Sequence, residues 1–146
     1  MGFPRQRVTL ITLSVTDLAR AKAFYAGWGW QPHGESQPGI VFYQMNGAAL
    51  ALFGRAELAA DQARSEQELG TGAMTLAQNC LDAAEVDQVF AAALAAGATC
   101  LKKPETVFWG GYSGYFADPD GHVWEVAANP FWPLADDGSL ILPEPD

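Results

Sequence analysis

The sequence predicts an α+β fold in which two similar halves, each a βαβββ module, form paired curved mixed sheets around a central cavity. Each half begins with a strand pattern that leads into an aspartate and a short amphipathic helix. The first helix is expected to stop at Gly27, with Gly29 following, and the second at Gly97; Gly29 and Gly97 take equivalent positions after the helices, and further strand patterns follow. The two glycines set a repeat of roughly 65–70 residues, which suits the duplication of a domain-sized module.

The first module is predicted over residues 7–55. Residues 8–15 alternate between a fully apolar face and a mixed face, which indicates a strand. Asp17 stands where a side chain caps the start of a helix, and the helix is expected over residues 18–25. Asn46-Gly47 supplies a tight turn, because both residue types tolerate positive φ. Three strands complete this module, at residues 30–33, 40–45 and 48–54.

The second module is predicted over residues 73–128, after a connector of residues 56–72 that is rich in Ala, Glu and Gln and is expected to be an exposed helix. Asp82 is the expected cap of a helix over residues 85–94. The sequence Asp118-Pro119-Asp120-Gly121 predicts the last hairpin turn. The strands of this module are expected at residues 74–80, 99–102, 112–117 and 122–127, and residues 129–146 form a C-terminal arm, all within a single domain of residues 1–146.

The amino-acid composition argues against some classes of binding partner. The chain has 8 Lys and Arg against 17 Asp and Glu, a formal net charge of −9, which argues against nucleic acids and anionic membranes. Cys80 and Cys100 form no spaced framework, so we expect two free, buried thiols in a reducing compartment. The N-terminal segment lacks an uninterrupted apolar stretch, so no signal peptide or membrane span is expected. These features predict a cytoplasmic protein.

Two stretches of the chain resemble the motifs of a known superfamily. The first is Thr12-Leu13-Ser14-Val15-Thr16-Asp17-Leu18, followed by Ala23-Phe24-Tyr25 and Gly29-Trp30. The second is Phe116-Ala117-Asp118-Pro119-Asp120-Gly121-His122-Val123-Trp124-Glu125-Val126. They resemble motifs of the vicinal oxygen chelate superfamily, which includes glyoxalase I, bleomycin-resistance proteins, fosfomycin-resistance proteins and extradiol dioxygenases. The resemblance reaches Asn129 and implies a homodimer, as in many relatives.

The resemblance also implies where a metal would be held. Mapped by motif, the four ligand positions of the metal enzymes fall on Leu10, Ala51, Thr75 and Glu125, and only Glu125 matches. An open catalytic site needs at least three ligands of His, Asp, Glu or Cys type. The two histidines, His33 and His122, are expected at the surface. No metal or other cofactor is therefore expected, which argues against dioxygenase and glyoxalase I chemistry.

Glu125 is the candidate catalytic residue of the cavity. Alternation places it on one face with Val123 and Ala127, while Trp124 and Val126 point toward a helix. It would serve as a general base or as a hydrogen-bond acceptor for a ligand, or else be tied to a neighbouring donor; the three alternatives stay open. Aromatic and small residues around it suit a planar ligand. The further candidate ligand-binding residues are Thr12, Ala51, Phe53, Thr75, Asn79, Trp109, Tyr112 and Tyr115, with Ser14 and Ala49 beside them.

The function expected from these features is metal-independent binding of a small molecule, as in drug or metabolite sequestration. Negative charge and aromatic faces favour an aromatic or cationic ligand. The alternative is a lyase or isomerase that uses Glu125 as a base or keeps it as a remnant metal ligand.

Overall fold

The computed structural model describes residues 4–145; residues 1–3 of the N-terminal segment and residue 146 of the arm lie outside it. In that part of the chain, no helix has the length and apolar character needed to cross a bilayer. The elements follow the order β1 (Leu10–Val15), α1 (Leu18–Trp28), β2 (Ile40–Gln44), β3 (Ala49–Gly54), α2 (Arg55–Asp61), the 3₁₀ helix η1 (Glu66–Glu68), β4 (Thr75–Asn79), α3 (Ala83–Ala95), β5 (Thr99–Thr106), β6 (Tyr112–Ala117) and β7 (Val123–Ala128).

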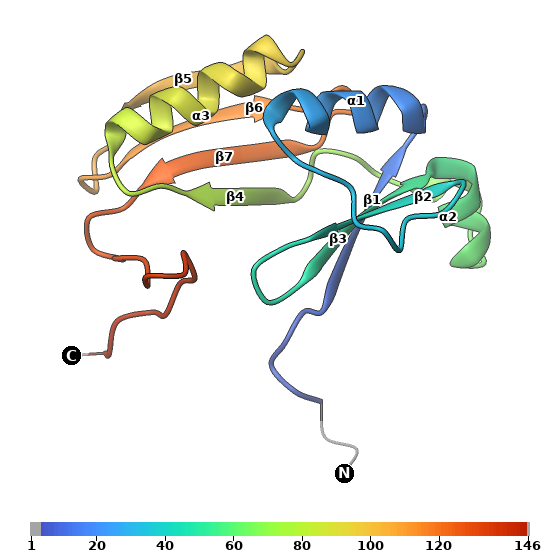
Figure 1. Cartoon of the computed structure of the whole chain (residues 1–146), viewed down its shortest axis with the longest axis horizontal. Coiled ribbons are helices and arrows are strands. Elements are labelled where there is room, and N and C mark those ends of the chain that lie inside the picture. The colour runs from blue at the N-terminus through green and yellow to red at the C-terminus, as the bar shows by residue number, and fades with distance from the viewer. Residues whose placement is uncertain (1–3, 146) are drawn as a thin grey trace.

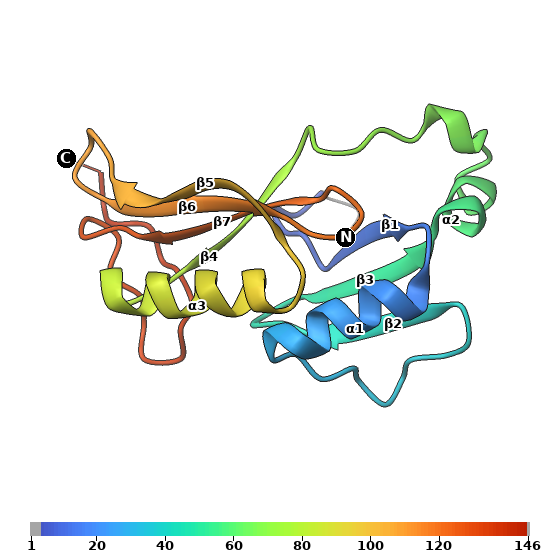
Figure 2. The ribbon, with the colours of Figure 1, turned by 90° about the horizontal axis from the view of Figure 1, so that it is seen from above.

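Each half forms its own mixed sheet. The first sheet has the order β1-β3-β2 and the second has the order β4-β7-β6-β5. In both, the first strand of the half pairs in parallel with the last, and the remaining pairs are antiparallel. Helices α1 and α3 lie next to each other on one side of the molecule, each against its own sheet (Figure 1 and Figure 2). The α+β class and the two-module organisation are confirmed, and the two sheets do not close over one another.

The two modules repeat the same helix geometry. Asp17 and Asp82 each accept a hydrogen bond from the backbone N–H three residues further on, at 3.1 and 2.9 Å. Gly29 and Gly97 have φ values of +113° and +115°, in the left-handed region that only glycine adopts at little cost. The N–H after each glycine returns to the carbonyl five residues earlier, at 2.8 and 3.0 Å. The predicted N-caps and the end of the second helix are therefore confirmed. The predicted end of the first helix is wrong, because α1 runs through Gly27 to Trp28, and Gly27 instead lies close to Ala96, just after α3.

Three predicted elements are wrong in part. Residues 30–33 form no strand; their single bond to β2 runs from the His33 N–H to the Phe42 carbonyl at 2.7 Å, and Pro32 has no N–H to extend the pairing. The connector is not one continuous helix. Helix α2 is followed by Ala63, which adopts a φ of 57°, and the 3₁₀ helix η1 comes after it. Strand β5 runs on past residue 102 to Thr106, with register shifts that admit Pro104.

Aromatic side chains fill the seam between the modules. The Trp124 ring of the second module lies 5.2–6.3 Å, between centroids, from the rings of Tyr25, Trp28 and Trp30 of the first. The Tyr25 hydroxyl donates to Asp118 Oδ2 at 2.7 Å and accepts from Trp124 Nε1 at 3.0 Å. The two halves thus share one core, which fixes the position of one sheet relative to the other.

Candidate ligand-binding site

Glu125 lies near the middle of the second sheet, on the face away from α3. Strand register places Ala77 of β4 on one side of it and Tyr115 of β6 on the other, with Lys102 of β5 next to Tyr115. Trp124, its neighbour in sequence, points the opposite way and is 5% exposed in the core. The predicted alternation of β7 is confirmed. We call the row Ala77, Glu125, Tyr115 and Lys102 the Glu125 row.

The polar groups of this row are organised by a hydrogen bond. The Tyr115 hydroxyl donates to Glu125 Oε2 at 3.3 Å, and both side chains are half-buried. Burial raises the pKa of Tyr115, the charge of Glu125 and their hydrogen bond raise it further, and Lys102 opposes them. Tyr115 therefore keeps its proton at neutral pH and continues to donate. Among residues 4–145 no donor pairs with the second oxygen, Oε1, which leaves it for a donor group of a ligand.

The four positions that the resemblance relates to metal ligands do not form a metal site. Leu10 and Ala51 lie on the first sheet and offer only carbon atoms, while Thr75 and Glu125 lie on the second. Within the described part of the chain, no group of three or more His, Cys, Asp or Glu residues could hold a metal ion. The donor set does not fit a divalent metal, because one carboxylate and one hydroxyl are too few.

The candidate residues of the first sheet are less accessible than predicted. Thr12, Ala51 and Phe53 share the face away from α1, as the strand register requires. Ala51 is 0% exposed, however, because it lies in the central strand between its larger partners Thr12 and Phe42. Thr12 and Phe53 are half-buried and stay open to contact. Ala51 therefore cannot touch a ligand without a rearrangement of its neighbours.

Of the three candidate aromatics in the second module, only Tyr115 shares the face of Glu125. Tyr112 is three residues away on the same strand, so it points to the other face, where its hydroxyl donates to Asp87 of α3 at 2.8 Å. The Trp109 ring folds over Gly111, in the space that a Cβ at Gly111 would occupy. Both aromatics are thus used in local packing.

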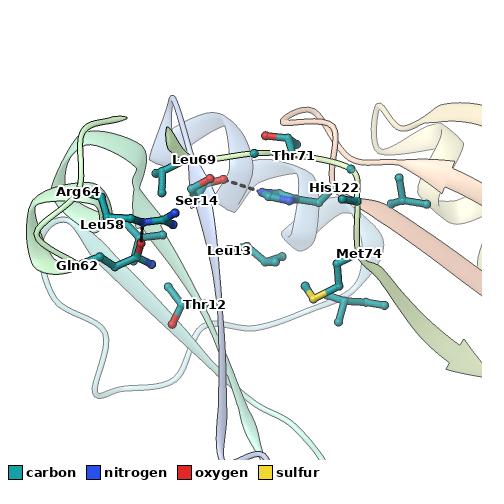
Figure 3. A pocket seen from close by; sticks show the side chains of 15 residues that line it. Thr12, Leu13, Ser14, Leu58, Gln62, Arg64, Leu69, Thr71, Met74 and His122 are labelled. Atoms are coloured by element: carbon teal, nitrogen blue, oxygen red, sulfur yellow. Dashed lines mark hydrogen bonds between the residues drawn. The ribbon is translucent and has the colours of Figure 1, made fainter. Parts of the chain in front are cut away.

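A pocket of about 350 Å³ lies where the start of β4 meets β1 and the connector (Figure 3). His122 lines it and donates from Nε2 to the Ser14 carbonyl at 2.7 Å. His122 is therefore half-buried and joins the modules, which corrects the surface position predicted for it, whereas His33 is exposed as predicted. Thr12 also reaches this pocket, and Arg64 there donates to Gln62 at 2.7 Å.

Thr75 and Asn79 lie on the face of the Glu125 row, at opposite ends of β4. Thr75 is exposed, and Asn79 lines a larger cavity where β4 ends. The candidate residues therefore do not line one common cavity. The structure brings Glu125 and Tyr115 together, with Thr75 and Asn79 in flanking rows, and leaves Thr12, Ala51 and Phe53 on the other sheet.

The fold and this site define a two-module α+β domain of the vicinal oxygen chelate type. The family model of the Glyoxalase/Bleomycin resistance protein/Dioxygenase superfamily matches residues 7–126, and the chain belongs to that superfamily. A comparison with curated proteins gives no match.

Solved structures give the same fold. A glyoxalase-related enzyme from Fulvimarina pelagi is 39% identical, with a TM-score of 0.88 over 96% of this chain and 100% of that one. A glyoxalase/bleomycin resistance protein/dioxygenase family enzyme from Burkholderia phytofirmans PsJN is 20% identical, with a TM-score of 0.74 over 82% and 96% of the two chains. A lactoylglutathione lyase from Agrobacterium tumefaciens is 24% identical, with a TM-score of 0.67 over 89% and 98%. The similarity to the last two structures supports the fold assignment alone.

Proposed function

We propose that this protein binds a small molecule without the help of a metal ion, on the face of the second sheet that carries the Glu125 row. The observation that carries the proposal is the hydrogen-bonded pair of Tyr115 and Glu125, a carboxylate with an oriented donor. Ala77, which lies next to Glu125 on this face, is small and exposed, so it leaves room for a ligand. One carboxylate oxygen and the aromatic ring suit an amine or a hydroxyl attached to a planar group.

Two further properties belong to the same proposal. The free thiols of Cys80 and Cys100 support a place in the reducing cytoplasm. A second copy of the chain would cover the faces that the two sheets leave uncovered, where Leu10 of β1 is 45% exposed. We therefore expect a homodimer, which sedimentation equilibrium would detect as twice the chain mass. A monomer at micromolar concentration would contradict this part.

The binding proposal is tested by Glu125→Gln, which keeps the shape of the side chain and removes its charge. Glu57→Gln on α2 is the matched control, because Glu57 is exposed and lies away from this sheet. A panel of aromatic amines, alcohols and acids is titrated calorimetrically against the three proteins. We expect an amine to bind the wild type, and Glu125→Gln to weaken that binding about tenfold or more, since a hydrogen bond to a charged group is lost.

Elemental analysis after purification without chelators completes the test. A stoichiometric divalent metal would contradict metal-independent binding, and equal affinities of the Glu125 and Glu57 variants would contradict the site. The alternative function is a lyase or isomerase with Glu125 as base, and the 39% identity to a glyoxalase-related enzyme favours it. In that case Glu125→Gln would lower kcat about a hundredfold or more, with a smaller effect on substrate binding.

A further inference from the structure

A cavity of about 1020 Å³ lies between the two sheets, where β4 ends. Its walls come from the β2–β3 hairpin, from residues 77–79 of β4 and from the C-terminal arm, which folds back beneath β4 (Figure 1). Asn46 Nδ2 of the hairpin donates to the Asp137 carbonyl of the arm at 2.9 Å and so joins two walls. The cavity reaches past β4 to the helix-covered side of the sheets, because Tyr43 and Trp124 line it. Ala77 of the Glu125 row also lines it, so the cavity borders that row, but Glu125, Tyr115 and Lys102 are not among its lining residues.

Two side chains that line this cavity carry a buried oxygen with no hydrogen-bond partner among residues 4–145. The Tyr43 side chain is 1% exposed, and its hydroxyl is buried without a hydrogen bond. Gln78 Oε1 on β4 is buried and unpaired as well. Buried polar atoms are almost always hydrogen-bonded, since leaving one unpaired costs about 1–3 kcal/mol. Gln78 Oε1 only accepts, and the Tyr43 hydroxyl both donates and accepts, so a group with N–H or O–H donors can bond to both oxygens.

The walls of the cavity limit the chemistry further. Aromatic faces come from Trp30 and Trp124 on the core side and from Trp132 on the arm. Among the lining residues of the described part of the chain, the charged ones are all acidic, namely Glu85, Asp136 and Asp137, with no Lys, Arg or His. Aromatic faces and acidic groups attract a cation and repel an anion.

We propose that this cavity is a second ligand site, which takes an arylalkylamine: a planar ring system that carries a protonated amine. The ring lies against the tryptophans, and the ammonium N–H groups bond to the Tyr43 hydroxyl and Gln78 Oε1. The volume is at the upper end of the range for drug-sized ligands, so a molecule of two or three fused rings fits. The argument for this site rests on Tyr43 and Gln78 and that for the Glu125 row on Glu125 and Tyr115, although Ala77 borders both.

The test uses three probes with the same ring system: 2-(2-naphthyl)ethylamine, the corresponding alcohol and 2-naphthylacetate. They are titrated calorimetrically into the full chain, its Tyr43→Phe variant and the matched control Tyr112→Phe, whose hydroxyl bonds to Asp87 on the surface. We expect the amine to bind wild type about tenfold more tightly than the alcohol, and the acid to bind more weakly still. Tyr43→Phe should weaken amine binding about tenfold, and Tyr112→Phe should leave it unchanged.

The thermal stability of the variants provides a second test of the proposal. Tyr43→Phe removes a hydroxyl that has no partner, so the free protein should unfold at the same temperature as wild type or a higher one. Trp132→Ala on the arm, where the side chain is 41% exposed, should also weaken the amine while the fold persists. Three outcomes would overturn the proposal: no binding of the amine, equal binding of amine and acid, or an amine affinity that Tyr43→Phe leaves intact. Loss of binding in Glu125→Gln with none in Tyr43→Phe would assign the amine to the Glu125 row instead.

Discussion

The contact between Tyr25 and Asp118 joins the helix of the first module to the last hairpin of the second, and its removal should weaken the whole fold. Tyr25 is 0% and Asp118 is 3% exposed. Tyr25→Phe keeps the ring in the aromatic seam and removes only the hydroxyl. Asp118 Oδ2 then loses its donor at 2.7 Å, and the Trp124 indole N–H loses its acceptor at 3.0 Å.

The magnitude follows from these two losses. A hydrogen bond to a charged group contributes about 1.5–3 kcal/mol and a neutral one about 0.5–1.5 kcal/mol. We therefore expect the free energy of unfolding to fall by about 3 kcal/mol. For a domain of this length that corresponds to a drop in Tm of roughly 10 °C.

Urea unfolding followed by tryptophan fluorescence measures this change. The midpoint should move to lower urea while the m-value stays constant, since the native fold is kept. Tyr112→Phe is the matched control, because it removes a hydroxyl that bonds to an aspartate at 2.8 Å at the surface. A loss below about 1 kcal/mol for Tyr25→Phe, or equal losses in both variants, would refute the reasoning that burial gives this bond its importance.

The same contact predicts how stability depends on alkaline pH. Burial, and then the charge of Asp118, raise the pKa of the Tyr25 hydroxyl in the folded protein. Above the ordinary tyrosine pKa of about 10 the unfolded chain binds fewer protons than the folded one, so stability falls as pH rises further. Below that pH this contribution is constant. Tyr25→Phe should flatten the alkaline fall measured by urea unfolding at several pH values, and an unchanged slope would contradict the assignment.

Two further predictions concern the thiols and a glycine. Cys100 is exposed and Cys80 is buried, with a pKa raised to about 11 by burial and then by nearby acidic groups, so a thiol reagent near pH 8 should label one thiol per chain quickly. The fast phase should disappear in Cys100→Ser; two fast thiols in wild type would show that Cys80 is open. Gly114→Ala should destabilise the protein by about 1–3 kcal/mol in thermal or urea unfolding, because its Cβ would lie 2.8 Å from the backbone nitrogen of Pro104. Gly34→Ala, with open space around it, should change little, and similar effects of the two substitutions would argue against the close approach.

The local features of the fold could be predicted because each has a short-range physical cause. An aspartate before an apolar stripe caps a helix, and a glycine after it accepts the left-handed φ, so Asp17, Asp82, Gly29 and Gly97 marked both helices. The alternation along β7 gave the face of Glu125 for the same reason. The prediction that both thiols are buried was half wrong, because Cys100 is exposed on β5, the edge strand of its sheet within residues 4–145.

The features that could not be predicted depend on contacts between distant segments. Residues 30–33 have the composition of a strand, but Trp30 packs into the aromatic seam and leaves only one backbone bond to β2. His122 follows a turn, which favours the surface, yet a carbonyl 108 residues earlier fixes it between the modules. The sequence could not predict that the Tyr43 hydroxyl lacks a hydrogen-bond partner. Alternation along the strand places the ring in the core, but it does not indicate what the hydroxyl contacts.

The shared seam also constrains how the two halves can change over time. A duplicated module starts with two equivalent copies, each free to drift alone, but here Tyr25 and His122 have their partners in the opposite copy. A substitution at either position leaves a polar group of the other module without its partner. A chimaera that joins this first half to the second half of a relative would therefore need that second half to carry Asp118 and Trp124, the partners of Tyr25. The two modules therefore depend on each other for these contacts, although they still repeat the same helix geometry and strand pairing.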